Sequence, residues 1–188
     1  STVIDFEIPK KYGLRQTIGD TLGIGGIFRA LRTIPVMLDY CRIIEEVAPN
    51  ALLLDYSNPM AMLTGAILKA TGVRTVGLCH SVQVCATHLC RELDLPDDNL
   101  QWRIAGVNHQ GWLLEISRCG EDLYPEIKRR AERPEYKAKD AVRFELMKWF
   151  GYYVTESSEH SAEYVPWFIK RSAPELIDRF HIPLDEYP

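Results

Sequence analysis

Apolar side chains recur every three or four positions from residue 23 to residue 47. This spacing predicts a long helix or two joined helices, with a kink at Pro35. Two short apolar runs follow at residues 51–59 and 75–81, and helical patterns follow each of them, at residues 62–72 and 82–93. The order strand, helix, strand, helix predicts parallel strands that are buried on both faces and joined by right-handed crossovers.

The pattern changes after this first part of the chain. Residues 101–111 and 112–123 alternate as two paired strands, and the turn between them spans residues 108–111. Further helices are predicted over residues 124–131, 139–150 and 162–170, with a short last helix from Pro174. We therefore predict an α/β protein with a partial Rossmann-like domain over residues 1–103 and an α+β domain over residues 104–188.

Polar side chains stand where the predicted strands end. Asn58 follows the first strand, Cys79 and His80 follow the second, and His109 lies in the predicted hairpin turn. Ligands bind beyond the carboxyl ends of the strands in open parallel sheets. A thiolate and an imidazole, with the amide oxygen of Asn58, form a mixed set that suits a divalent transition metal with open positions. The alternatives are core packing for Cys79 and hydrogen bonds to nearby carbonyl groups for His109.

Neighbouring side chains in an extended segment point to opposite sides. Cys79 and His80 are therefore not expected to bind one metal together. If Cys79 is the ligand, the imidazole of His80 is left to act as a general acid or base. The spacing of paired ligands that is typical of structural zinc sites is absent from the sequence.

The segment TESSEHSAEY, residues 155–164, permits two interpretations. Its serines and acidic residues are typical of the capped start of a helix. It is equally consistent with a loop that delivers a base and hydroxyl-binding groups to a sugar or similar polyol. The segment holds Glu156, Glu159, His160, Glu163 and Tyr164, and Trp167 and Phe168 follow as candidate stacking groups.

The glycine-rich segment GIGGIF, residues 23–28, also has two interpretations. It differs from the dinucleotide fingerprint because Phe28 replaces the third glycine and because no strand precedes it. It is either a plain helix start or a helix entry whose backbone N–H groups face a ligand's oxygens. The sequence also begins partway through a secondary-structure pattern and ends on PLDEYP without a last helix or strand. We therefore expect a fragment of a longer protein.

Composition excludes several classes of function. The net charge of −4 and the absence of a basic cluster argue against a nucleic-acid partner. No apolar run approaches the roughly 20 residues of a membrane span, and no export signal is present. Five cysteines are an odd and thinly spread set, which favours a reducing cytoplasm over a disulfide scaffold.

Six segments together resemble glycoside hydrolase family 4, and the α-galactosidase branch is the most similar. They are KYGLRQTIGDTLGIGGIFRALRTIP, DYSNPMAM, VGLCHSVQ, AGVNHQGW, GYYVTESSEHSAEYVPWFIK and IPLDEYP. The resemblance covers nearly the whole chain. It implies a fold similar to lactate and malate dehydrogenases, NAD and a divalent metal (usually Mn²⁺) as cofactors, an α-glycoside as substrate, and assembly into a homo-dimer or homo-tetramer.

The resemblance also implies a reaction course that differs from that of two-carboxylate glycosidases. In the family, NAD⁺ takes a hydride from C3 of the sugar, and the resulting ketone acidifies the proton at C2. A base removes that proton while the metal stabilises the enediolate, and the aglycone then leaves. Water adds before the hydride returns to C3.

Family roles transfer to particular residues of this chain. Cys79 and His109 resemble the metal ligands, Asn58 resembles the group that binds substrate hydroxyls, and His80 occupies the proton-donor position. A histidine directly after the cysteine favours an unphosphorylated sugar. No residue of the chain is matched to NAD.

The base at C2 has three candidates in this sequence. His160 and Tyr164 rank ahead of Glu159. Because the nucleotide fingerprint is missing, we expect this chain to be inactive by itself.

Alternative functions are an α-glucosidase or α-galacturonidase of the same family, a 2-hydroxy acid dehydrogenase of the same fold class, and a non-catalytic module. A dehydrogenase needs no metal-binding thiolate, so Cys79 argues against it.

Overall fold

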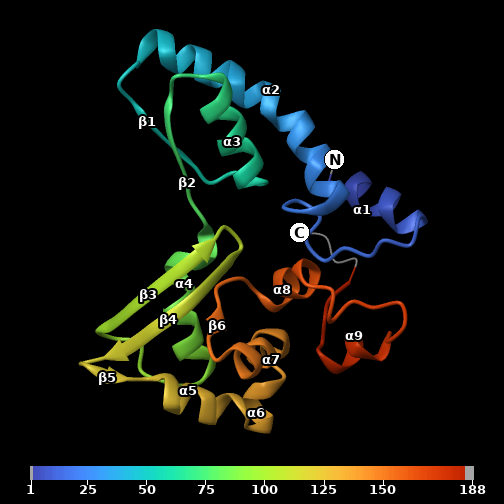
Figure 1. The fold of residues 1–188 in the computed structure, drawn as a ribbon, viewed down its shortest axis with the longest axis vertical. Coiled ribbons are helices and arrows are strands. Elements are labelled where there is room, and N and C mark those ends of the chain that lie inside the picture. Colours follow the sequence, from blue (N-terminus) through green and yellow to red (C-terminus); the bar gives the residue numbers. More distant parts are fainter. Residues whose placement is uncertain (1, 185–188) are drawn as a thin grey trace. The chain divides into compact units, whose positions relative to one another are not determined.

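A computed structural model describes residues 2–184 of the chain, which divides into two compact units (Figure 1). The first unit contains the chain up to Cys79, and the second spans His80–Pro183. The chain passes from the first unit into the second at the peptide bond between Cys79 and His80, and Leu184 belongs again to the first unit. Among the described residues, no helix has both the length and the apolar character that a membrane span requires.

The first unit contains the predicted βαβ arrangement. Its elements are α1 (Thr2–Lys11), α2 (Gly23–Val47), β1 (Leu52–Asp55), α3 (Met60–Ala70) and β2 (Arg74–Gly77). The two strands pair in parallel, from Leu52 opposite Arg74 to Asp55 opposite Gly77. Cys41, Ile67 and Val73 form a buried cluster where α2, α3 and the start of β2 meet. The helix α1 is absent from our sequence prediction.

The long helix α2 is one element that continues through Pro35. At its start, a Cβ atom on Gly25 would lie 2.5 Å from the carbonyl oxygen of Gly19, and one on Gly26 would lie 2.8 Å from the carbonyl carbon of Thr21. Residues 19–21 therefore lie directly against the helix, and only glycine permits this approach. At these two glycines the chain's own backbone occupies the space beside the helix.

The second unit is an antiparallel sheet with helices. The sheet contains β3 (Leu100–Val107), β4 (Gln110–Arg118), β5 (Glu121–Asp122) and β6 (Tyr153–Val154), and both β3 and β6 pair with β4. The helices are α4 (His80–Glu92), α5 (Tyr124–Ala131), α6 (Pro134–Lys137), α7 (Ala141–Phe150), α8 (Ser158–Tyr164) and α9 (Glu175–Arg179).

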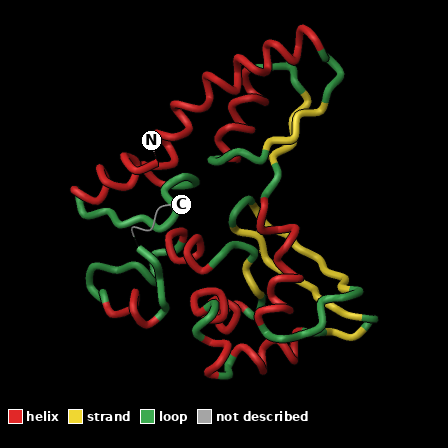
Figure 2. Tube along the Cα trace, turned by 180° about the vertical axis from the view of Figure 1, so that it is seen from behind, coloured by secondary structure: helices red, strands yellow, loops and turns green. Residues whose placement is uncertain are grey.

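A core lies where α4 and α5 pack against β4, and Figure 2 shows the helices and strands of this unit from behind. Leu89 and Leu93 from the α4 side meet Leu113 and Ile116 of β4 and Ile127 of α5. These side chains are almost fully buried. The α/β fold class that the sequence predicts is therefore present, as a parallel strand pair followed by an antiparallel sheet with helices.

Three predicted boundaries need correction. The second predicted strand, within residues 75–81, ends at Gly77, and the helix predicted from residue 82 begins at His80. The helix predicted over residues 139–150 begins at Ala141, with Asp140 as its N-cap. The helix predicted over residues 162–170 is wrong, because α8 ends at Tyr164.

Local chemistry explains the position of α8. The hydroxyl oxygen of Ser157 accepts a hydrogen bond from the backbone N–H of His160 at 3.3 Å, which caps the helix earlier than predicted. Val165 precedes Pro166, and a residue before proline is disfavoured in the helical region. Val165 accordingly has φ −122° and ψ 145°, which ends the helix.

Candidate functional site

His109 lies at the tip of the β3–β4 hairpin, where Val107 pairs with Gln110. Its φ is +62°, a left-handed conformation in which histidine is enriched among non-glycine residues. A Cβ atom on Gly106 would lie 2.3 Å from the carbonyl oxygen of Gln110, so the hairpin needs glycine there. The side chain of His109 is 7% exposed, and the tight hairpin therefore holds a buried imidazole at a defined position.

Glu156 is a buried carboxylate on the segment between β6 and α8. Its side chain is 1% exposed, and the backbone N–H of the preceding Thr155 donates to the carbonyl oxygen of Gly111 at 2.9 Å. Ser81 donates its hydroxyl proton to Oε2 of Glu156 at 2.7 Å. Nε2 of His109 lies 4.0 Å from Oε1 of the same carboxylate. These contacts place Glu156 between the hairpin and the first turn of α4.

Cys79 is the third member of this group. It is bonded to His80, the first residue of α4, at the junction between the units. One ligand atom each from Cys79, His109 and Glu156 lies within 4.8 Å of the other two. A thiolate, an imidazole and a carboxylate at such separations form a donor set that suits a divalent transition metal and leaves positions open. The residues present therefore fit a metal ion.

Tyr164 contacts the far side of the His109 ring. Its hydroxyl oxygen lies 2.6 Å from Nδ1 of His109, and the two rings stack with centroids 5.7 Å apart. Nδ1 of His109 is thus engaged by Tyr164, while Nε2 faces Glu156. Histidine ligands of metals commonly bind the ion through one ring nitrogen and hydrogen-bond through the other.

His160 lies one helical turn before Tyr164 on α8. Its Nδ1 is 2.8 Å from Oγ of Ser157, and its Nε2 is 3.9 Å from Oε2 of Glu156. Its ring meets the rings of His109 and Tyr164 edge to face. The structure therefore brings the rings of His109, His160 and Tyr164 together, and both His109 and His160 face Glu156. Glu159 is half-buried on the same helix.

The remaining two predicted site residues lie in different units. Asn58 belongs to the first unit, in the loop between β1 and α3, and its carbonyl oxygen accepts a hydrogen bond from Nε of Arg29 at 3.1 Å. His80 is exposed and opens α4 instead of ending a strand. The alternation argument for Cys79 and His80 is therefore wrong in its premise, because the two residues do not belong to one extended strand.

Sequence reasoning named Glu156 in a candidate site segment but missed it as a metal donor. The residue lies in the polar segment TESSEHSAEY, but it is one of three glutamates there and its spacing carries no signal. The stacking role considered for Phe168 is also wrong, because this ring is 1% exposed and packs against Trp149 and Phe180. Trp167 remains exposed.

Two other cysteines of the second unit have a structural role. Burial raises the pKa of the Cys85 and Cys90 thiols to about 11. Both thiols stay protonated near neutral pH, and both belong to the core. Cys79 is therefore better placed than either of them to offer a thiolate to a metal.

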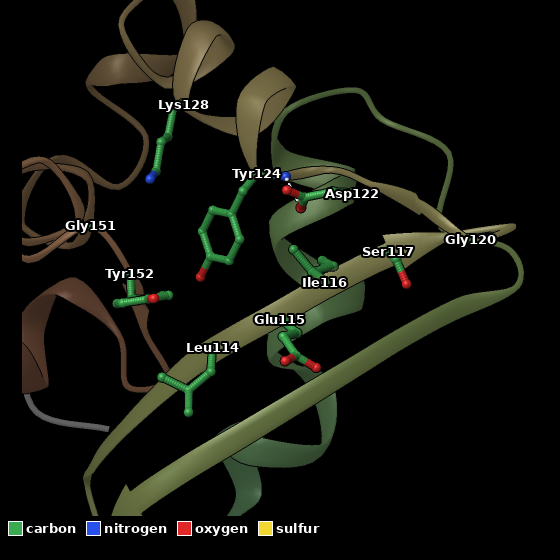
Figure 3. Close-up of a pocket in the computed structure, with 10 residues that line it drawn as sticks. All are labelled: Leu114, Glu115, Ile116, Ser117, Gly120, Asp122, Tyr124, Lys128, Gly151 and Tyr152. Atoms are coloured by element: carbon green, nitrogen blue, oxygen red, sulfur yellow. Dashed lines mark hydrogen bonds between the residues drawn. The ribbon is translucent and has the colours of Figure 1, made fainter.

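The second unit also contains a cavity of about 520 Å³ beside β4 and α5 (Figure 3). Figure 3 shows Lys128, Asp122 and Tyr124 around it, and Nζ of Lys128 lies 5.2 Å from the centroid of the Tyr124 ring. The residues that line it include none of the predicted site residues. This cavity is therefore separate from the group around Glu156.

Comparison with known proteins gives matches along both parts of the chain. Residues 1–95 match the model of the family 4 glycosyl hydrolases, and residues 104–188 match the model of the C-terminal domain of that family. The chain is 65% identical to an alpha-galactosidase of Bacillus subtilis (strain 168), over 100% of this chain and 44% of that protein. It is 41% identical to an alpha-galactosidase of Rhizobium meliloti (strain 1021), over 94% of this chain and 36% of that protein. The chain thus spans less than half the length of these relatives.

Solved structures share the fold. The Bacillus subtilis protein lplD is 27% identical, with a TM-score of 0.76 over 93% of this chain and 45% of that chain. A 6-phospho-alpha-glucosidase from gut microorganisms, solved in complex with NAD and Mn²⁺, is 24% identical, with a TM-score of 0.60 over 85% of this chain and 42% of that chain. The division into domains at residue 103 stays a prediction. Because the family models match most of the sequence in two consecutive parts, the chain belongs to family 4 of the glycosyl hydrolases.

Proposed function

We propose that the full-length protein that contains this chain is an α-galactosidase that depends on NAD and a divalent metal. The observation that carries the proposal is the grouping of Cys79, His109 and Glu156 within 4.8 Å of one another. The 65% identity to a Bacillus subtilis alpha-galactosidase supports galactose as the sugar. The proposed course is transient oxidation at C3, deprotonation at C2, elimination of the aglycone and addition of water.

Cys79, His109 and Glu156 are the residues that would hold the metal. When bound, a divalent ion such as Mn²⁺ supplies a Lewis acid that stabilises negative charge on the sugar oxygens. Ser81 orients Glu156 through its hydrogen bond to Oε2, which leaves Oε1 on the side of His109. The three donors together leave coordination positions for substrate hydroxyls.

Tyr164 is the base that the geometry supports best. If Nε2 of His109 faces the metal, the proton of the neutral imidazole resides on Nδ1 and is donated to the Tyr164 oxygen at 2.6 Å. In its phenolate form, the Tyr164 oxygen would accept the C2 proton of the sugar. His160 is the second candidate because its ring lies beside the rings of Tyr164 and His109.

Two further roles rest on the family resemblance. We propose that His80 protonates the departing aglycone oxygen and that Asn58 binds substrate hydroxyls. His80 is exposed at the first turn of α4, so its imidazole can exchange protons with solvent between turnovers.

NAD enters the proposal through the family, and a solved structure of similar fold contains it. NAD⁺ would supply the hydride acceptor for C3. The glycine-rich start of α2 does not provide a pyrophosphate cradle at Gly25 and Gly26, because the backbone of residues 19–21 occupies that space. We therefore assign no residue of this chain to NAD. A cytoplasmic location and a homo-dimer or homo-tetramer remain predictions.

Hydrolysis of p-nitrophenyl α-galactoside by the full-length protein tests this function. The assay contains NAD⁺, Mn²⁺ and a thiol reductant, and each is omitted in turn. We expect loss of activity without NAD⁺ or after chelation of Mn²⁺. Activity that persists without both would refute the proposal. Parallel assays with the α-glucoside and the α-galacturonide distinguish the other activities of the family.

Site variants connect the assay to these residues. Cys79→Ala and His109→Ala should each reduce metal-dependent turnover by a factor of 10² or more, because each removes a donor from the metal. Cys119→Ala is the matched control, since Cys119 is exposed in the turn between β4 and β5. Wild-type rates in both site variants would remove the assignment of the metal ligands.

A further inference from the structure

The segment that carries Glu156 is fixed by contacts on both of its sides. On the N-terminal side, Nε of Arg143 donates to the carbonyl oxygen of Val154 at 3.2 Å. On the C-terminal side, the hydroxyl group of Ser158 donates to Oδ1 of Asp140 at 2.5 Å. Both partners lie in or directly before the first turn of α7. The three residues between Val154 and Ser158 are thus anchored at both ends to one helix start.

The two anchoring groups are paired with each other. Nε of Arg143 lies 3.3 Å from Oδ2 of Asp140, and the exposed fractions of their side chains are 9% and 5%. The hydroxyl group of Tyr153 donates to the same Oδ2 atom. The guanidinium group of Arg143 also lies over the Tyr153 ring, 4.1 Å from its centroid. Asp140, Arg143 and Tyr153, which are buried, and the half-buried Ser158 form one network, which we name the α7 clamp.

The groups of the α7 clamp are better suited to fixing the direction of the attached chain segment than to stabilising the fold. A buried ion pair contributes little net stability, since desolvation offsets most of its attraction, and apolar side chains of similar size often serve as well. Hydrogen bonds differ from apolar contacts because they are directional. Burial raises the pKa of Tyr153 well above its ordinary value, so its hydroxyl group stays protonated as a donor to Asp140.

The clamp lies next to the proposed metal ligands along the chain. Val154 is two residues before Glu156, and Ser158 is two residues after it. Between them, the N–H group of Thr155 bonds to Gly111 on the hairpin strand that follows His109. Figure 1 shows β6 and α8 directly before and after this segment, beside α7. The position of the Glu156 carboxylate relative to His109 therefore depends on these contacts.

We propose that the α7 clamp positions Glu156 for metal binding, an inference that rests on the proposed function. Asp140, Arg143 and Ser158 are then positioning residues that act through Glu156 and do not touch the metal. Loss of one contact lets the carboxylate move away from the other two donors. Loss of a group that orients a metal ligand typically lowers metal affinity by about 10- to 100-fold.

The test measures the affinity of the full-length protein for Mn²⁺ alone, by the EPR signal of free Mn²⁺ in a titration with MnCl₂. Ser158→Ala removes the hydroxyl donor to Asp140 and should raise the Kd for Mn²⁺ by about tenfold. Ser158→Thr keeps a hydroxyl group and should restore the affinity. Asp140→Asn should weaken binding in the same direction.

Tyr136→Phe is the matched control. It also removes a hydroxyl group that donates to an aspartate, Asp94 at 2.8 Å, but it lies on α6, away from Glu156. We expect a wild-type Kd for Mn²⁺ in this variant even if its melting temperature falls as much as that of Ser158→Ala. A wild-type Kd in Ser158→Ala, or an equal loss of affinity in both variants, overturns the inference alone. Absence of Mn²⁺ binding in the wild type overturns both the inference and the proposed function.

Discussion

At the scale of single residues, the cysteines differ in their burial and in the side chains around them. Cys85 and Cys90 are buried in the core of the second unit, and their thiol pKa is raised to about 11. Cys119 is exposed, and Cys79 is half-buried next to His109 and Glu156. Reactivity should therefore separate the structural cysteines from the proposed ligand.

We expect iodoacetamide at pH 8 to modify Cys119 readily and Cys79 more slowly, and to leave Cys85 and Cys90 unmodified. At a pKa of about 11, roughly one thiol in a thousand is a thiolate at that pH. Mn²⁺ should protect Cys79 and leave Cys119 reactive, as measured by peptide mass spectrometry on the full-length protein. Equal labelling of Cys79 with and without Mn²⁺ would contradict its role as a ligand.

At the scale of elements, α4 ends with an unfavourably placed carboxylate. Glu92 is its last residue, where a negative charge opposes the helix dipole. Among the described residues, its Oε2 atom is buried without a hydrogen-bond partner. Burial, with a smaller contribution from the negative charge of Asp140, raises the pKa of Glu92 to about 6, although Arg143 and Lys139 oppose the shift.

This pKa shift predicts a pH-dependent loss of stability. The folded state favours protonated Glu92, so its contribution to stability is complete below about pH 4.5 and is lost as the pH rises through about 6. Replacing Glu92 with Gln should therefore raise the melting temperature at pH 7.5 by about 2–4 °C, and the gain should vanish near pH 4.5. Thermal melts at several pH values measure it.

Glu121→Gln, which changes an exposed glutamate of β5, serves as the control for the loss of charge. A gain in Glu92→Gln that does not vary with pH would show that the buried charge is not its cause.

At the scale of the whole molecule, the two units differ in how completely they bury their apolar side chains. The second unit has a continuous core that joins α4, α5, α7 and the sheet. In the first unit, Leu52, Leu54 and Val76 of the two parallel strands are 53%, 54% and 44% exposed. Parallel sheets are normally covered on both faces, so we expect other parts of the full-length protein to cover these strands.

We therefore expect residues 80–183, expressed alone, to fold and to unfold in one cooperative transition. Residues 1–79 alone should aggregate or lack such a transition, because their exposed strands leave apolar surface in water. Circular dichroism during heating compares the two pieces. A non-cooperative melt of residues 80–183 would mean that this unit also needs the rest of the protein.

The sequence by itself determined the order of most elements, because hydrophobic periodicity reflects which face of a helix or strand is buried. It predicted the strand, helix, strand order of the first unit, the β3–β4 hairpin and the helix from Tyr124 to Ala131. It did not predict β6 or α6, each of which is too short to show a period. The resemblance of its segments to family 4 also followed from sequence alone, and the comparisons confirm it.

Only the tertiary structure decided which polar groups meet. Cys79, His109 and Tyr164 are candidates from the sequence, yet nothing in their spacing shows that Tyr164 bonds to His109 or that Glu156 is the third donor. These groups come from a helix start, a hairpin tip and a loop before α8. Side chains so far apart along the chain are brought together by packing against a shared core, and such packing leaves no local pattern in the sequence.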